Sequence, residues 1–222
     1  MKVISLGGSL IWKRGAIRTA YIKEFHNIVR EYSRKDKICV VVGGGEIARK
    51  YVQVGRKLGL DEFLLDYLGI MATRINASLF ISEDSYPTVP LNVEEAVKAL
   101  ATHNLVFMGG TEPGHTTDAV ALMVAERTKC KEVINLSNVD GIYDKDPRKH
   151  RDVKLIEKIS YDRALKMALE SYTGASTNFV MDPLAIKIAA RSKIVIKILN
   201  GNDLENFKKA LEGKKFYGTT IR

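Results

Sequence analysis

The sequence predicts an α/β fold in which helices cover both faces of a parallel or mostly parallel sheet. Short apolar runs typical of buried strands alternate with longer segments of helical periodicity along the whole chain. Such alternation is typical of strand–helix–strand units whose helices pack on the sheet. No internal repeat, low-complexity segment or flexible linker interrupts the pattern. We therefore expect one domain over residues 1–222, either undivided or in two lobes.

The first half of the chain is expected to contribute three strands, four helices and a short extended piece at 86–90. Each strand is a short apolar run, and each helix shows apolar residues at helical spacing. The expected strands are 3–6, 38–42 and 106–108. The expected helices are 18–35, 46–58, 61–81 and 93–101.

Two of these helices carry further expectations. The apolar residues of 46–58 should face inward; they are Ile47, Tyr51, Val52 and Leu58. The helix 61–81 has apolar residues on more than one face, which fits either a subunit interface or simple burial. One side of it carries Asp66, Gly69, Ile70, Thr73 and Ala77, and Arg74 lies close to that side.

The second half continues the alternation. Asp146-Pro147 marks a turn, and the charges that follow it mark a solvated loop. Asp182 is expected to cap a helix that has Pro183 at its first position. The expected helices are 117–128, 161–170, 182–191 and 203–211. The expected strands are 133–136, 194–199 and 218–221.

The composition is that of a globular protein with a sizeable core. Of 222 residues, 45% are hydrophobic and 27% are charged. No apolar run approaches the length of a membrane span, so we expect a cytoplasmic protein without membrane contact. Cys39 and Cys130 are far apart and lie in or beside apolar runs, which favours reduced structural thiols over a disulfide or a metal pair.

The net charge of +9 fits either nucleic acid or a ligand that carries several phosphate charges. The positive residues are scattered, and clusters such as Arg34, Lys35 and Lys37 are short. There is no RNP-like aromatic strand and no zinc-finger spacing. We therefore expect no nucleic-acid partner and favour a small anionic ligand.

Four expected strands end in small or polar loops, which are Gly7-Gly8-Ser9, Gly43-Gly44-Gly45, Gly109-Gly110-Thr111 and Ser137-Asn138. The carboxyl ends of parallel strands share one edge of the sheet, where open α/β folds bind ligands. Glycine lets the backbone approach a ligand and aim N–H groups at it. No G-x-x-x-x-G-K-[ST] or G-x-G-x-x-G motif occurs, which makes the P-loop and dinucleotide-binding interpretations minor alternatives.

The segment 106–121 is expected to form a strand, a loop rich in donors and a helix start. It either binds a phosphate or is an ordinary strand–loop–helix connection. Arg49 and Lys187 lie one turn into expected helices near these loops, where they could neutralise phosphate or could be ordinary solvated side chains. His115 is the one histidine in a candidate loop, and no catalytic dyad is apparent. A phosphate monoester is already largely ionised at neutral pH. Phosphoryl transfer to it needs mainly positioning and charge neutralisation, which glycine loops, these cations and Mg²⁺ can supply.

Nearly the whole chain resembles the amino acid kinase superfamily, and most closely the UMP kinases of archaeal type. The G-H-T-T-D-A segment at 114–119 separates UMP kinases from acetylglutamate and aspartate kinases. The motifs that carry the resemblance are S-L-G-G-S at 5–9, V-V-V-G-G-G-E-I-A-R-K-Y at 40–51, D-Y-L-G-I-M-A-T-R-I-N-A at 66–77, M-G-G-T-E-P-G-H-T-T-D-A-V-A at 108–121, S-N-V-D-G-I-Y-D-K-D-P at 137–147 and M-D-P-L-A-I-K-I-A-A-R-S at 181–192.

The resemblance implies a three-layer α/β/α sandwich that converts UMP and ATP to UDP and ADP with Mg²⁺, usually as a homohexamer. On the donor side it implies that ATP is bound by Gly8, Ser9, Gly45, Arg49, Ser137, Asn138, Tyr143 and Asp146. On the acceptor side it implies that UMP is bound by Gly44, Asp66, Thr111, Glu112, Pro113, Gly114, His115, Thr116 and Thr117. Lys187 and Arg49 are the candidate catalytic residues, and no side chain is assigned to a metal. If the domain is divided into two lobes, the N-terminal one would bind the acceptor and the C-terminal one ATP.

Two positions depart from the family pattern. Many superfamily members have lysine where this chain has Ser5, and threonine is common where it has Ser137. The loss of a lysine keeps open a nucleotide-binding sensor that has lost catalysis. Other superfamily kinases, acting on isopentenyl phosphate, carbamate or acetylglutamate, are the nearest enzyme alternatives. The isopentenyl phosphate enzymes have a histidine after the second glycine loop, where this chain has Glu46-Ile47-Ala48-Arg49.

Overall fold

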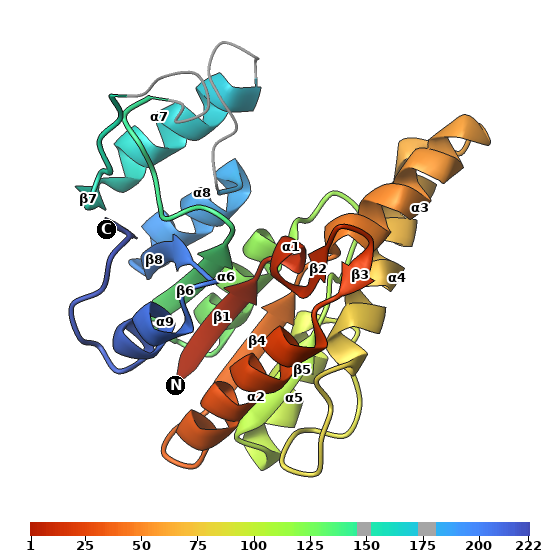
Figure 1. Cartoon of the computed structure of the whole chain (residues 1–222), viewed down its shortest axis with the longest axis horizontal. Coiled ribbons are helices and arrows are strands. Elements are labelled where there is room, and N and C mark those ends of the chain that lie inside the picture. The colour runs from red at the N-terminus through yellow and green to blue at the C-terminus, as the bar shows by residue number, and fades with distance from the viewer. Residues whose placement is uncertain (146–151, 173–180) are drawn as a thin grey trace.

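The computed structural model describes residues 1–145, 152–172 and 181–222. Its centre is a seven-stranded sheet in the order β5-β4-β1-β6-β8-β9-β7, with helices on both faces (Figure 1). The five strands from β5 to β8 are parallel, β9 runs antiparallel to β8, and β7 is parallel to β9. The predicted α/β sandwich with a mostly parallel sheet is confirmed.

The sheet strands are β1 (Lys2–Leu6), β4 (Ile38–Val42), β5 (Leu105–Met108), β6 (Glu132–Ser137), β7 (Lys158–Ile159), β8 (Val195–Asn200) and β9 (Thr219–Ile221). A separate hairpin pairs β2 (Trp12–Lys13) with β3 (Ala16–Ile17). The described helices are α1 (Gly8–Ile11), α2 (Thr19–Ser33), α3 (Gly45–Lys57), α4 (Glu62–Ser78), α5 (Val93–Thr102), α6 (Thr117–Arg127), α7 (Tyr161–Tyr172), α8 (Pro183–Ser192) and α9 (Leu204–Leu211).

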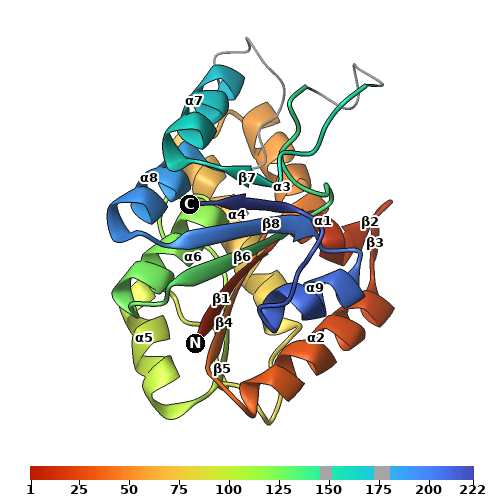
Figure 2. The same cartoon turned by 90° about the vertical axis from the view of Figure 1, so that its left-hand side faces the viewer.

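Two helical layers enclose the sheet. Helices α2 and α9 lie on one side of it, and α5, α6 and α8 lie on the other (Figure 2). Every residue of β4 and β5 is buried, because each face of these strands meets a helical layer. Alternate residues therefore serve different cores: Cys39 and Val41 pack toward α6, and Val40 packs toward α2. This double burial explains the unbroken apolar runs.

The predicted start of α8 is confirmed, as are the predicted free thiols. Asp182 caps α8, because its Oδ1 accepts a hydrogen bond of 2.8 Å from the Leu184 N–H, with Pro183 in the first turn. Cys39 and Cys130 are buried and free of disulfides, as predicted. Within the described ranges, no helix combines the length and the apolar content needed to cross a membrane. The predicted turn at 146–147 lies outside the described residues.

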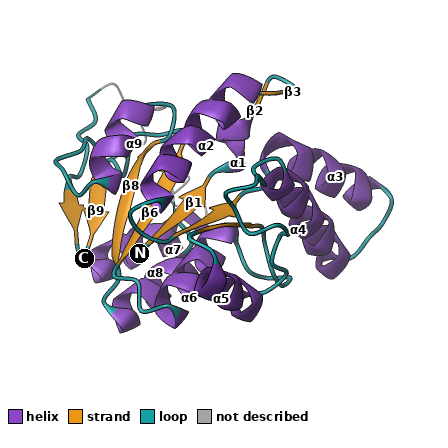
Figure 3. Cartoon of the chain, turned by 90° about the horizontal axis from the view of Figure 1, so that it is seen from below, coloured by secondary structure: helices purple, strands orange, loops and turns teal. Residues whose placement is uncertain are grey.

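The expectation that the apolar residues of α3 face inward is wrong for Tyr51 and Leu58, while Ile47 and Val52 are half-buried. Tyr51 and Leu58 are 53% and 75% exposed, and Gly55 is the one fully buried residue of the helix. The reason is that α3 packs on α4 and not on the sheet, so the two helices extend beyond one end of the molecule (Figure 3). A Cβ on Gly55 would lie 2.8 Å from the Leu65 side chain, which shows how closely the helices approach.

Three short elements were not predicted, which are α1, the β2–β3 hairpin and β7. The hairpin turns through Arg14 and Gly15, whose φ angles are +52° and +82°. Glycine adopts such angles readily and arginine does not, so the sequence signal for this turn is weak. The other two elements have four and two residues, too few to show a period.

Candidate active site

The first two glycine loops touch each other at the carboxyl edge of the sheet. A Cβ on Gly8 would lie 2.1 Å from the backbone nitrogen of Gly45, and one on Gly45 would lie 2.4 Å from the Gly8 oxygen. Gly45 also has a φ of +63°, which favours glycine. Gly44 and Ser9 flank this contact. The structure therefore brings together four of the predicted nucleotide-binding residues at the ends of β1 and β4.

One face of α4 fastens the glycine loops. Asn76 donates to the carbonyl oxygens of Gly43 at 2.8 Å and Gly44 at 3.0 Å, and its own oxygen accepts from Trp12. The Gly110 N–H donates to Thr73 Oγ1 at 2.7 Å. Thr73 belongs to the side of the helix that was singled out from the sequence, whereas Asn76 does not, and neither residue was assigned a role there.

Arg74 holds the start of the acceptor loop, which we define as residues 111–117. Its guanidinium donates to the carbonyl oxygens of Gly110 at 3.1 Å and Thr111 at 3.2 Å, and to that of Leu91. The arginine was noted only for lying near the side of α4 that was singled out from the sequence. Its contacts are to the backbone, and they place the loop over the end of β5.

Asp66 reaches the same loop from the first half of α4. Its Oδ2 accepts a hydrogen bond of 2.7 Å from the Gly114 N–H, and Gly114 has a φ of +82°. The His115 N–H closes a turn to Glu112, while the buried His115 Nδ1 has no hydrogen-bond partner among the described residues. The predicted acceptor residues are therefore gathered in one loop, with Asp66 beside it.

Two helix N-termini meet at the end of the acceptor loop. Thr116 Oγ1 accepts a hydrogen bond of 3.1 Å from the Ala119 N–H, which caps α6. The same hydroxyl donates to Asp182 Oδ2 at 2.5 Å, and the other oxygen of Asp182 caps α8. Helix N-termini favour negative charge. The Asp182 carboxylate already supplies it at α8, whereas α6 is capped by a neutral hydroxyl, so the N-terminus of α6 is the one that suits a phosphate.

We use the word crevice for the region outside the carboxyl ends of β1, β4, β5 and β6, where these loops lie. The two predicted cations are on α3 and α8, the helices that begin there. Arg49 is one turn into α3, and Lys187 is on the second turn of α8. Both are exposed, and neither has a hydrogen bond or ion pair within the part of the chain that the structure describes. Their side chains are free to meet a phosphate, and they are equally free to be solvated.

A buried polar cluster lies between β1 and β6 at the base of the crevice. Ser5 Oγ and Asn135 Nδ2 both donate to Asp118 Oδ1, at 2.6 and 2.7 Å. Ser5 and Asn135 are 2% and 3% exposed. Burial raises the pKa of Asp118 from its ordinary 3.8 to about 6, and the charge of Asp182 adds to the rise.

The sequence reading missed Asp118 and Asn135. Their signals were present, since Asn135 interrupts an apolar strand and Asp118 opens a helix with Thr117. Ser5, which was noted as a departure from the family pattern, has a partner in the structure, because its hydroxyl donates to the Asp118 carboxylate.

The loop after β6 forms the far side of the crevice. Asp140 accepts from Tyr143 OH at 2.8 Å and from Asn200 Nδ2 at 2.9 Å. Burial and the bond to Asp140 raise the pKa of Tyr143. Ser137 and Asn138 lie where β6 ends, on the same edge as the glycine loops. The structure thus brings them near Tyr143, while the predicted Asp146 lies outside the described residues.

Known proteins match this chain along its length. The family model for the amino acid kinase family matches residues 1–200. The uridylate kinase of Thermoplasma acidophilum is 43% identical over 99% of this chain and 95% of its own. That of Methanobrevibacter smithii is 40% identical over 99% and 97%. The crystal structure of uridylate kinase from Archaeoglobus fulgidus superposes with a TM-score of 0.89 at 38% identity, covering 100% of this chain and 99% of that one. This chain belongs to the amino acid kinase family.

Proposed function

We propose that this chain is a UMP kinase, which transfers the γ-phosphoryl group of ATP to UMP and gives UDP and ADP. The observation that carries the proposal is the acceptor loop 111–117, which is held by Asp66 at one point and by Asp182 at another. It lies in a chain that is about 40% identical, over almost its whole length, to proteins named uridylate kinase.

The proposed acceptor half is the N-terminal part of a single domain. Asp66 is placed to accept hydrogen bonds from ribose hydroxyls, because its carboxylate is exposed beside the loop. The UMP phosphate is proposed to lie at the N-terminus of α6, against Thr116, Thr117 and Gly44. His115 Nδ1, which is buried and unpartnered in this loop, is a further group for the nucleotide to satisfy.

The proposed donor half spans the end of β1 and the loop after β6. The ATP phosphates are assigned to the contact of the first two glycine loops, where Gly8, Ser9 and Gly45 present backbone N–H groups and Arg49 adds a charge. The nucleoside is assigned to the loop after β6, with Ser137, Asn138, Tyr143 and Asp146. This places the γ-phosphate toward the junction of α6 and α8.

The proposed mechanism is direct transfer. An oxygen of the UMP phosphate attacks the γ-phosphorus, the new P–O bond forms as the bond to the β-phosphate oxygen breaks, and ADP leaves with the electron pair. No base is needed, since the attacking oxygen is already ionised. Lys187, on the second turn of α8, is proposed to neutralise the charge of the transferring group, with the N-terminus of α6 and Arg49 supporting it.

Mg²⁺ is the proposed cofactor, bound with ATP. When bound, it would neutralise part of the phosphate charge and so favour the transfer. In the described ranges no three or more His, Cys, Asp and Glu side chains form a metal cluster. The donor set that fits a magnesium ion is Asp118 with Asn135. Both hydrogen bonds to Asp118 go to one oxygen, and the buried Asn135 Oδ1 has no hydrogen-bond partner among the described residues. Oxygen ligands from one or two side chains, completed by phosphate and water, are what magnesium prefers.

The protein is proposed to act as a homo-oligomer, specifically a homohexamer. Helices α3 and α4 carry large apolar side chains that are 42% to 75% exposed. These residues, which we name the α3–α4 apolar face, are Tyr51, Val54, Leu58, Phe63, Leu64, Tyr67, Met71 and Ile75. A contiguous face of this kind is typical of a subunit interface, and a second copy would cover it. The proposed location is the cytoplasm, where both nucleotides are found and where buried free thiols stay reduced.

The test is to incubate the purified chain with Mg-ATP and each nucleoside monophosphate and to measure the diphosphate formed. We expect UDP from UMP, with slower turnover of CMP. If UMP gives no UDP while another small acceptor is phosphorylated, the substrate assignment is wrong. Tight binding of UMP and ATP without turnover would support the sensor alternative instead.

A further inference from the structure

We propose that Arg18 is a positioning residue for the donor nucleotide, which links the phosphate-binding end of the crevice to the nucleoside-binding loop. This inference rests on the proposed assignment of ATP to the ends of β1 and β6. None of the predicted site residues includes Arg18, which lies at the N-terminus of α2 on the other side of the β2–β3 hairpin.

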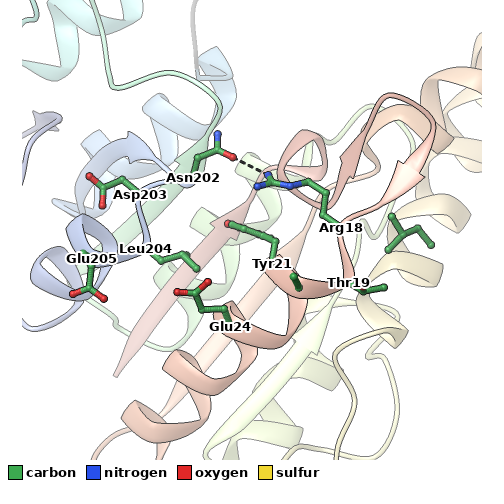
Figure 4. A pocket seen from close by; sticks show the side chains of 10 residues that line it. Arg18, Thr19, Tyr21, Glu24, Asn202, Asp203, Leu204 and Glu205 are labelled. Carbon is green, nitrogen blue, oxygen red and sulfur yellow. Dashed lines mark hydrogen bonds between the residues drawn. The ribbon is translucent and has the colours of Figure 1, made fainter.

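Arg18 bridges two segments that are distant in the sequence. Its Nη1 donates to the Leu10 carbonyl at 2.9 Å. The same atom donates to Asn202 Oδ1 at 2.7 Å (Figure 4). The guanidinium also lies over the Tyr21 ring, 4.6 Å from its centroid. One planar group is therefore fixed by two acceptors and one aromatic face, a combination that lysine cannot reproduce.

The hydrogen bond to Leu10 affects the residues that are proposed to bind the ATP phosphates. Leu10 belongs to α1, a helix of four residues that begins at Gly8 and includes Ser9. A single helical turn has little stability of its own, so its position depends on contacts with its surroundings. The hydrogen bond from Arg18 to the last turn of α1 therefore helps to set where Gly8 and Ser9 present their donors.

The hydrogen bond to Asn202 affects the loop that is proposed to bind the nucleoside of ATP, through a chain of further hydrogen bonds. Asn202 donates from its backbone N–H and its side-chain amide to Asn200 Oδ1, both at 3.0 Å. Asn200 Nδ2 donates to Asp140 Oδ1 at 2.9 Å, and Tyr143 OH donates to Asp140 Oδ2 at 2.8 Å. Each amide in this relay has its orientation fixed by its neighbours, so a loss at Arg18 is transmitted to Tyr143.

The fold does not depend on Arg18 alone, which makes the role testable. Tyr21 OH donates to the Gly201 carbonyl at 2.8 Å, and this buried bond joins α2 to the loop after β8 independently. Arg18 and Asn202 instead line an open pocket of about 660 Å³ between the starts of α2 and α9. Replacing either of them leaves the hydrophobic core intact and removes the link between the two ends of the donor site.

The experiment uses the full chain with Arg18→Lys, Asn202→Ala and the double variant. Lysine can satisfy one acceptor but not hold both in a fixed geometry, so we expect the KM for ATP to rise about three- to tenfold. The KM for UMP and the melting temperature should change little. Because both residues act through one chain, the double variant should match the single ones and not their product. Arg127→Lys is the matched control. Arg127 is the last residue of α6, away from the proposed site, and makes two hydrogen bonds to Glu94 of α5, so its replacement should change neither KM.

Calorimetric titration with a non-hydrolysable ATP analogue separates this inference from the proposed function. If the wild-type chain binds the analogue but does not convert UMP, the UMP assignment is wrong and the analogue's dissociation constants still test Arg18. The inference is overturned if Arg18→Lys leaves ATP-analogue affinity unchanged, if it raises both KM values equally, or if the two single effects multiply. Should Arg18→Lys not fold, Asn202→Ala, which alters an exposed loop residue, decides between the same outcomes.

Discussion

Thr116 and Asp182 are joined by a hydrogen bond of 2.5 Å, although each caps a different helix. Thr116 belongs to the acceptor loop and caps α6, while Asp182 caps α8, the helix that carries Lys187. A single contact therefore couples the position of the acceptor loop to the position of the proposed catalytic lysine.

Removing the Thr116 hydroxyl should cost both stability and turnover. Thr116→Val keeps the shape but loses the cap of α6 and the bond to Asp182, so we expect the free energy of unfolding to fall by about 1–2 kcal/mol. The measurement is urea unfolding, together with kcat for UMP. Thr116→Ser keeps the hydroxyl and should restore both values, and a valine variant with unchanged kcat would contradict the coupling.

Asp118 should make the protein less stable as the pH rises. Its pKa is raised from 3.8 to about 6, so the folded state binds its proton more tightly than the unfolded state does. The stabilising effect of that proton is complete below pH 4 and is lost as the pH rises through 6, by up to about 3 kcal/mol. Asparagine can still accept from Ser5 and Asn135 and carries no charge.

We therefore expect Asp118→Asn to be more stable than the wild type at pH 8 and equal to it near pH 4. Urea unfolding of both proteins without nucleotide, over this pH range, measures the difference. Asp162→Asn, an exposed change in the first turn of α7, is the control for loss of one negative charge. A constant difference between Asp118→Asn and the wild type across the range would show that the buried carboxylate is not its source.

The features that the sequence predicted correctly are those that are determined by residues close together in the chain. The buried strands, the Asp182 cap and the glycine loops each follow from neighbouring residues, and the structure confirms them. The inward face of α3 was wrong because periodicity shows that a helix has an apolar stripe and not what covers it. An apolar stripe left exposed in the chain looks the same in sequence as a buried one.

The parts of the site that escaped prediction are those that need the sheet register. Ser5 and Asn135 are neighbours because β1 pairs with β6 in parallel, which places them opposite each other across 130 residues of sequence. Arg18 and Asn202 are 184 residues apart. No local pattern contains such pairs, and only the polar interruption of an apolar strand at Asn135 hinted at one of them.

Replacing Asp66 should weaken the binding of UMP and leave that of ATP unchanged. Asp66→Asn replaces a charged acceptor beside the acceptor loop, so we expect the KM for UMP to rise roughly 10- to 100-fold while that for ATP changes less than about twofold. Steady-state kinetics with each substrate varied in turn gives both values. Asp61→Asn is the control, because asparagine also caps helices well and Asp61 caps α4 at its start. Equal effects on the two substrates would count against the ribose assignment.

The α3–α4 apolar face should hold subunits together. Val54 is 54% exposed on α3, and Val54→Asp places a charge in the middle of that face. We expect light scattering after gel filtration to show a smaller assembly than the wild type, with the melting temperature of the subunit unchanged. Leu169→Asp, at a position 47% exposed on α7, should leave the assembly as it is. A wild-type chain that is monomeric at micromolar concentration would refute the interface.

Lys187 should contribute to the chemical step and little to binding. It is exposed on the second turn of α8, has no partner in the described part of the chain, and lies beyond the cap formed by Asp182. If it meets charge that develops on the transferring phosphoryl group, Lys187→Met should lower kcat by about 10²- to 10³-fold with modest changes in both KM values. Lys187→Arg keeps the positive charge on a side chain of different shape and should recover part of the lost kcat.

Lys166→Met is the control, because it removes the same charge from the exposed surface of α7, and its kcat should equal that of the wild type. A methionine variant that raises the KM for ATP without lowering kcat would instead make Lys187 a ground-state phosphate ligand, and Arg49 would then be the remaining candidate for the transferring group.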